Sequence, residues 1–161
     1  MIEDVRRRLA EEVERLNHEL NVTLPDALRR ALANGDLREN GDYHAALERQ
    51  GFVQARLSQL RSRLGRLSDI DPAKIPTDRV GLGSRVVVED KTSKTSETFE
   101  LVIPDAMDVE RGHISVASPL GRALLDRRVG ATVEVRLPTG VRQLKIKKLS
   151  TVHDLGDDDA R

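Results

Sequence analysis

The apolar residues in the first half of the chain recur with the spacing of packed helices. From Leu9 they fall at alternating steps of four and three positions, which places them on one stripe of a helix. Pro25 lies within this run and should interrupt the helix locally, because proline has no amide hydrogen and its ring clashes with the preceding turn. A second run of the same spacing follows, with one polar member. The first run comprises Leu9, Val13, Leu16, Leu20, Leu24, Ala27 and Ala31, and the second comprises Tyr43, Ala46, Gln50, Val53, Leu57, Leu60, Leu64 and Leu67.

A short turn joins the two predicted helices. Asn34-Gly35-Asp36 is typical of a chain reversal, so the helices should lie antiparallel as a hairpin. At a rise of ~1.5 Å per residue, about 30 residues form an arm on the order of 45 Å long. Two prolines break the helical periodicity between Asp69 and Pro76, which indicates a linker. We therefore assign residues 1–76 to an antiparallel two-helix coiled coil with its linker.

The second half of the chain has the two-residue period of β-strands. Within it, Ser118-Pro119 predicts the start of one short helix, since serine caps helix starts and proline suits the first turn. Residues 77–155 should form an antiparallel sheet with this helix, which makes the fold class α+β, and residues 156–161 an unstructured acidic tail. The expected strands are Ser84–Glu89, Ser96–Ile103, His113–Val116, Thr132–Leu137 and Val141–Leu149.

Composition narrows the chemistry that the chain can perform. The 161 residues carry 27 Lys+Arg and 27 Asp+Glu, so no net positive charge would hold the protein on nucleic acid. There is no cysteine, which excludes disulfides, thiol nucleophiles and cysteine-bound zinc. Three lysines, Lys145, Lys147 and Lys148, are expected to face water on an edge strand. No apolar stretch approaches the ~20 residues of a membrane span, and the amino end is too charged for a signal peptide. We therefore expect a cytoplasmic protein with no membrane partner.

The turn between the two helices concentrates acidic residues. Asp36, Glu39 and Asp42 fall within seven positions of what we call the tip, residues 35–43. One interpretation is a capping box, in which Asp36 accepts hydrogen bonds from the first turn and Glu39 reaches back. The alternative is a metal-positioning site, because Mg²⁺ is commonly held by one or two protein carboxylates together with phosphate oxygens and waters. Two carboxylates cannot enclose a metal ion, so such a tip would be half of a site.

Two long motifs carry a resemblance to a known family. The segment Gly35-Asp-Leu-Arg-Glu-Asn-Gly-Asp-Tyr-His-Ala-Ala-Leu-Glu-Arg-Gln-Gly-Phe52 closely resembles the tip and second helix of the bacterial transcript cleavage factors of the GreA/GreB family. Its His-Ala-Ala and Gln-Gly-Phe elements look more like the GreA branch. The segment Ile114-Ser-Val-Ala-Ser-Pro-Leu-Gly-Arg-Ala-Leu-Leu125 is similar to the carboxyl-terminal signature of the family. The likeness covers nearly the whole chain.

The resemblance implies a function on another protein. It implies a coiled-coil amino domain and an FKBP-like carboxyl domain that bind RNA polymerase, with the hairpin entering the secondary channel. Asp36 and Glu39 would then help position the second Mg²⁺ and the attacking water, so that polymerase cleaves backtracked nascent RNA and resumes from a new 3′ end. The factor would stimulate the polymerase without being an enzyme itself. It would hold no cofactor of its own and share Mg²⁺ with the polymerase, and we expect it to be a monomer.

The remaining candidate residues have supporting roles. Arg38 and Asn40 are expected to shape the tip, Asp42 to be a solvated acid near a helix start, and Tyr43 to pack at the seam between the helices. Polymerase docking is expected in the carboxyl-terminal domain near Ser118 and Pro119, as the resemblance implies.

Three alternatives remain open. The protein could bind the same channel and inhibit or modulate the polymerase without stimulating cleavage, although an inhibitor would have no use for the acidic spacing of the tip. A prolyl isomerase would fit an FKBP-like domain, but the carboxyl half has a single aromatic residue, Phe99, with which to line a pocket. A coiled-coil adaptor would need an apolar stripe on the outside of the hairpin.

Overall fold

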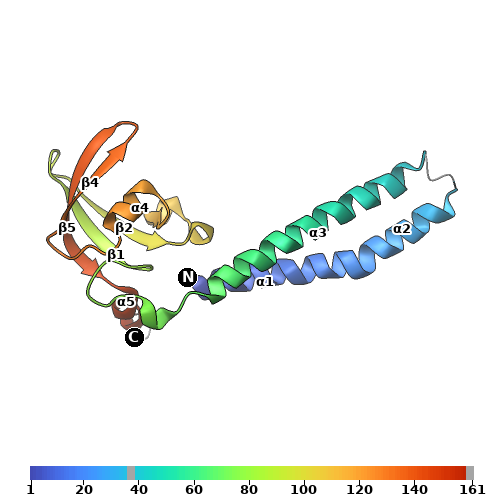
Figure 1. Cartoon of the computed structure of the whole chain (residues 1–161), viewed down its shortest axis with the longest axis horizontal. Helices are drawn as coiled ribbons and strands as arrows, with labels where there is room; N and C mark the ends of the chain where they lie inside the picture. Colours follow the sequence, from blue (N-terminus) through green and yellow to red (C-terminus); the bar gives the residue numbers. More distant parts are fainter. Residues whose placement is uncertain (36–38, 159–161) are drawn as a thin grey trace. The chain divides into compact units, whose positions relative to one another are not determined.

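The computed structural model describes residues 1–35 and 39–158. The chain forms two compact units, and each is described by itself (Figure 1). One is helical and comprises Glu3–Ile70, and the other comprises Met1–Ile2 together with the chain from Asp71 onward. The division falls within the segment in which two prolines end the helical pattern.

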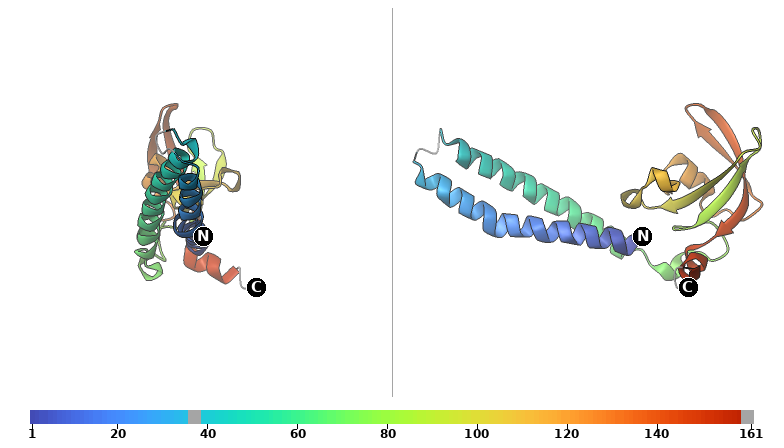
Figure 2. Two further views of the ribbon diagram at one scale, coloured as in Figure 1. Left: turned by 90° about the vertical axis from the view of Figure 1, so that its right-hand side faces the viewer. Right: turned by 180° about the vertical axis from the view of Figure 1, so that it is seen from behind.

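The helical unit is a hairpin of two antiparallel arms. Helix α1 (Ile2–His18), a π-helical turn (Glu19–Thr23) and helix α2 (Leu24–Ala33) form the first arm. Helix α3 (Gly41–Ser68) forms the second and runs alongside the first over its length (Figure 2). None of the helices in the described part of the chain combines the length and the hydrophobicity needed to cross a lipid bilayer.

The seam between the arms is built from the predicted apolar stripes. Each buried leucine removes apolar surface from water, which stabilises the hairpin by roughly 1.5–3 kcal/mol per side chain. Leu57 and Leu60 are fully enclosed, and Leu64 and Tyr43 are half-buried. The prediction of two packed helices is therefore confirmed. The buried residues of the seam are Val5, Leu9, Leu16, Leu24, Ala31, Ala46, Val53, Leu57, Leu60 and Leu67.

The predicted interruption near Pro25 takes the form of the π-helical turn. Pro25 is in the first turn of α2 and cannot donate a backbone hydrogen bond. The amide of Leu24 donates instead to the carbonyl of Glu19, five residues earlier, so the backbone widens by one residue before the proline. The arm continues without a break because proline is tolerated at the start of a helix.

The second unit contains a five-stranded sheet. Its strands are β1 (Arg85–Asp90), β2 (Ser96–Val102), β3 (His113–Ser115), β4 (Thr132–Leu137) and β5 (Gly140–Ser150), in the spatial order β3-β2-β1-β5-β4. One face buries an apolar cluster beneath a short helix. The buried members of this cluster are Val80, Val86, Val88, Leu101, Leu124, Val133, Val135, Leu144 and Ile146.

Two expectations about the sheet are wrong. The sheet is mixed and not antiparallel, because β3 pairs parallel to β2, with Leu101 opposite Ile114. The connection of residues 103–112 carries the chain back along β2, so that His113 pairs with Glu100 and β3 can run in the same direction as β2. The lysine-bearing strand β5 is also not an edge strand, since it lies between β1 and β4.

Two short helices complete this unit. Helix α4 (Pro119–Leu124) starts where the sequence predicts, and the Ser118 hydroxyl accepts a hydrogen bond from the amide of Gly121 at 3.0 Å. Helix α5 (Val152–Asp158) follows β5. It extends into the segment 156–161, which the sequence predicts to be unstructured, so that expectation is wrong for residues 156–158.

Candidate functional site

The tip connects the end of α2 to the start of α3. Asp36 and Arg38, two of its predicted site residues, lie outside the described residues. Glu39 is described and exposed, and it precedes both the N-cap residue of α3 and the first helical residue, Gly41. Within the described part of the chain, the Glu39 carboxylate forms no hydrogen bond or ion pair. It is therefore available to a partner molecule.

Asn40 fixes the point at which α3 begins. Its Oδ1 accepts a hydrogen bond from the amide of Tyr43 at 3.1 Å, which is the contact of an N-cap residue. Its Nδ2 donates to the carbonyl of Ala31 in the last turn of α2, at 2.5 Å. The amide of Asn34 donates to the same carbonyl at 3.1 Å. One side chain thus joins the end of the first arm to the start of the second.

This geometry tests one of the two interpretations of the acidic spacing, the capping box. A capping box formed by Asp36 and Glu39 would place Glu39 at the third position of a helix that starts at residue 37. The helix starts instead at Gly41 and is capped by Asn40, so Glu39 lies before the cap and the capping-box interpretation is wrong. The Glu39 carboxylate is not used to stabilise the helix.

The other described tip residues flank this start. Asp42 is exposed in the first turn of α3, where the partial positive charge of the helix end favours an acid. Tyr43 is half-buried, and its ring meets the ring of His44 edge-on at a centroid distance of 5.9 Å. This contact is within α3, so packing of Tyr43 at the seam between the helices stays a prediction.

The tip does not form a complete metal site by itself. Among the described residues, no group of three or more His, Cys, Asp or Glu side chains could hold a metal ion. Mg²⁺ needs six oxygen ligands in nearly ideal octahedral geometry, and proteins often supply only one or two of them. An exposed carboxylate on a capped helix start suits a site whose other ligands come from elsewhere.

Ion pairs hold the two arms in register behind the tip. Arg56 donates two hydrogen bonds to the Glu12 carboxylate, at 2.8 and 3.1 Å, and Arg49 donates two to Glu19, at 2.6 and 3.0 Å. These hydrogen bonds lower the pKa of Glu12 and of Glu19, with the positive charge of each arginine adding to the effect. The Arg49 guanidinium also lies 5.0 Å from the centroid of the Phe52 ring. Two arginines of α3 therefore connect it to the first arm of the hairpin.

The predicted docking residues lie in the second unit. Ser118 is half-buried, and its hydroxyl also donates a hydrogen bond to the carbonyl of Ser115 at 2.7 Å. Pro119 is exposed at the first position of α4. Gly121 is required beside them, since a Cβ there would lie 2.1 Å from the Ser115 carbonyl oxygen. The segment is thus a rigid helix start with an exposed proline.

Comparison with known proteins places both units in one family. A family model described as Transcription elongation factor, N-terminal, matches residues 2–68. A second, described as Transcription elongation factor, GreA/GreB, C-term, matches residues 75–151. The chain belongs to the GreA/GreB family. The resemblance seen in the two sequence motifs is therefore confirmed.

Individual members of the GreA/GreB family align over most of their length. Transcription elongation factor GreA of Thermodesulfovibrio yellowstonii is 38% identical over 143 residues, which are 89% of this chain and 90% of that protein. The GreA of Desulfotalea psychrophila is 37% identical over 145 residues, 90% of each chain. The crystal structure of the GreA factor homolog 1 protein of Thermus thermophilus aligns with a TM-score of 0.41 at 27% identity, covering 90% of this chain and 94% of that one.

Some contacts of the tip and of the hairpin could not be predicted from the sequence. The Asn40 contact with Ala31 spans nine residues, and the Arg56–Glu12 pair spans 44. Neither has a local signature, because the partners meet only when the arms pack. The cap itself had a signal in the sequence, since asparagine before a helix is a preferred N-cap residue.

Proposed function

We propose that this protein is a transcription elongation factor that stimulates RNA polymerase to cleave backtracked nascent RNA. The observation that carries the proposal is the Glu39 carboxylate, which is exposed immediately before the capped start of α3 and has no hydrogen-bond or ion-pair partner among the described residues. Membership of the GreA/GreB family supports it, as do relatives named transcription elongation factor GreA. RNA polymerase is accordingly the partner, and the hairpin is the element that reaches its active centre through the secondary channel.

The chemistry needs a metal site shared between two proteins. Hydrolysis of a phosphodiester bond requires stabilisation of the developing negative charge and activation of a water molecule, and Mg²⁺ supplies both. Glu39, together with Asp36, would complete the ligand shell of a Mg²⁺ held by the polymerase and orient the attacking water. The 3′ end of the backtracked RNA is the substrate. The described residues of the factor offer no further set of metal ligands, so we expect it not to cleave RNA on its own and to need no cofactor of its own.

Asn40 supports this role through geometry. Because its side chain ties Ala31 to Tyr43, it sets where the loop leaves α2 and where it enters α3. The loop that carries the acids is therefore fixed at both of its ends, at the last turn of α2 and at the first turn of α3. A carboxylate that must meet a metal ion in another protein gains from such preorganisation, since misplacement of a ligand by about 1 Å costs on the order of 100-fold in rate.

The test is RNA cleavage in a stalled, backtracked elongation complex with Mg²⁺. The parent protein should accelerate cleavage, and Asp36→Asn or Glu39→Gln should abolish the acceleration while binding to polymerase stays nearly unchanged. Glu48→Gln is the matched control, because Glu48 is an exposed acid on α3 away from the tip. If both tip variants cleave as well as the parent, the assignment is wrong. Slower nucleotide addition without enhanced cleavage would favour the inhibitory alternative.

A further inference from the structure

Helix α5 lies beyond the part of the chain that the family model matches, which ends at residue 151. Its start is well defined. The Asp154 carboxylate accepts hydrogen bonds from the amide of Thr151 at 2.8 Å and from its hydroxyl at 3.0 Å, so a side chain of the first turn reaches back to the residue before the helix. Thr151 itself is buried. A helix anchored in this way can position the side chains of its first turn.

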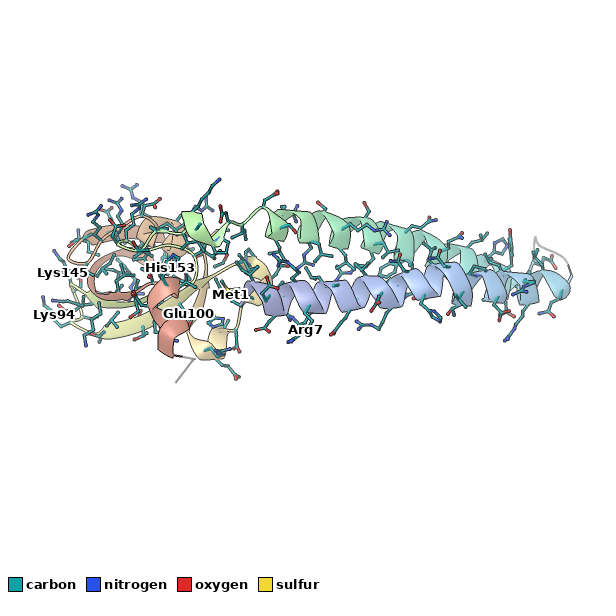
Figure 3. All side chains as sticks on the ribbon, turned by 90° about the horizontal axis from the view of Figure 1, so that it is seen from below. Met1, Arg7, Lys94, Glu100, Lys145 and His153 are labelled. Carbon is teal, nitrogen blue, oxygen red and sulfur yellow. The ribbon has the colours of Figure 1, made fainter. Side chains whose placement is uncertain are left out.

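One of those side chains binds the linker. The Nε2 of His153 donates a hydrogen bond to the carbonyl of Ile75 at 2.9 Å, joining residues 78 positions apart. The ribbon views place α5 beside the short 3₁₀ turn Pro72–Lys74 (Figures 1 and 2), and Figure 3 labels His153 on this helix. Asp71 starts that turn by accepting a hydrogen bond from the amide of Ala73 at 2.9 Å. The linker is therefore folded from Asp71 onward.

The linker and α5 each pack closely against the backbone of a glycine. A Cβ on Gly81 would lie 2.9 Å from Cδ of Pro76, so the linker packs directly on this backbone. A Cβ on Gly83 would lie 3.0 Å from Cβ of Val152, so the first residue of α5 packs in the same way two positions later. Directly after them, the buried Ser84 hydroxyl accepts a hydrogen bond from the amide of Gly81 at 2.9 Å. One rigid loop thus holds both segments.

We propose that α5 is a clamp that fixes the linker to the sheet-containing unit, and that His153 is its positioning residue. With residues 71–76 held, the chain that leaves α3 keeps its freedom only at the few residues between Ser68 and Asp71. The tip acids reach the metal site of another protein in a larger fraction of conformations when fewer flexible residues connect the arm to the docking unit. Each additional flexible residue multiplies the conformations available to the arm. The consequence for cleavage rests on the proposed function, whereas the clamp itself does not.

Spin labels measure the clamp directly. The chain has no cysteine, so Gln54→Cys on α3 and Thr132→Cys on β4, both at exposed positions, provide two unique labelling sites in the full-length protein. His153→Ala should broaden the distribution of distances between the labels. His153→Gln should keep the distribution of the parent protein, because the glutamine amide can donate to the same carbonyl. A distribution that His153→Ala leaves unchanged overturns the clamp.

Cleavage assays measure its consequence with the same variants, without labels. His153→Ala should lower the cleavage rate at saturating factor about 2- to 10-fold, the effect expected for loss of one net hydrogen bond. The half-saturating concentration should stay near that of the parent, and His153→Gln should restore the rate. A broadened distribution with an unchanged rate would overturn the positioning role. If the parent itself fails to stimulate cleavage, the proposed function fails, and the distance measurement still decides the clamp.

Discussion

At the scale of single residues, Asn40 performs two tasks that a variant series can separate. Asn40→Ala removes the cap of α3 and the contact with Ala31, so it should destabilise the hairpin by about 1 kcal/mol and lower cleavage stimulation. Asn40→Asp keeps an oxygen that can cap α3 but has no amide to donate to Ala31. It should therefore retain most of the stability and still lose stimulation. Thermal unfolding followed by circular dichroism, together with the cleavage assay, checks both outcomes. Equal stimulation of cleavage by the parent, Asn40→Ala and Asn40→Asp would contradict the positioning role of Asn40.

The two acids paired across the seam make the stability of the hairpin depend on pH. Because the pKa of Glu12 and of Glu19 is lowered below the ordinary 4.5 in the folded state, folding favours the ionised forms. Their stabilisation is therefore complete above pH 4.5 and is lost as the pH falls through the folded pKa values. The Glu12–Arg56 pair, which is partly exposed, should contribute about 0.2–1 kcal/mol.

The double variant Glu12→Gln/Glu19→Gln tests this dependence. At pH 7 it should melt at a lower temperature than the parent, and the difference should shrink as the pH falls through the lowered folded pKa values, because the parent carboxylates then become protonated as well. Melting curves recorded at several pH values measure the difference, and other acids with lowered pKa, such as Asp90 and Asp154, cancel because both proteins contain them. A difference that stays constant with pH would show that the pairs carry no charge-dependent stability.

At the scale of elements, α3 contains glycines that its packing does not require. A Cβ at Gly51 or Gly65 would meet no atom within 4 Å, and both lie inside a regular helix. Gly51→Ala and Gly65→Ala should each stabilise the hairpin by about 0.5–1 kcal/mol, because alanine restricts the unfolded chain and favours the helix. Chemical denaturation measures the gain. Gly121→Ala is the opposite case, since its Cβ would lie 2.1 Å from the Ser115 carbonyl oxygen, and it should destabilise the protein. Destabilisation by Gly51→Ala or Gly65→Ala would contradict the absence of a steric requirement for glycine at that position.

At the scale of the whole molecule, the two units should separate docking from chemistry. The buried cluster of the second unit lies entirely between Val80 and Ile146, so a fragment of residues 71–161 should fold alone. Dispersed amide resonances would establish its folding. We expect this fragment to compete with the full-length factor for RNA polymerase and to suppress cleavage, because it carries the predicted docking residues Ser118 and Pro119 without the tip. The same fragment with Pro119→Asp should compete less well. A fragment that stimulates cleavage would contradict this division.

The sequence by itself determined those features that depend on local spacing. Two packed helices followed from apolar residues repeated every three or four positions, since any helix with that pattern must bury one stripe. The start of α4 at Ser118-Pro119 followed from the chemistry of helix caps. The acidic tip and the family followed from contiguous residues. Each of these features is specified by side chains that are close to one another in the sequence.

Only the tertiary structure decided which distant groups meet. The parallel pairing of β3 with β2 and the interior position of β5 depend on the whole sheet, because the alternating pattern of a strand does not specify its neighbours. Helix α3 is capped by Asn40 and not by a capping box of Asp36 and Glu39, and the side-chain amide of Asn40 also donates to the carbonyl of Ala31 across the turn. The hydrogen bond from His153 to Ile75 likewise exists only because the chain returns to its own linker. Such contacts arise from packing between segments, and no local pattern in the chain encodes them.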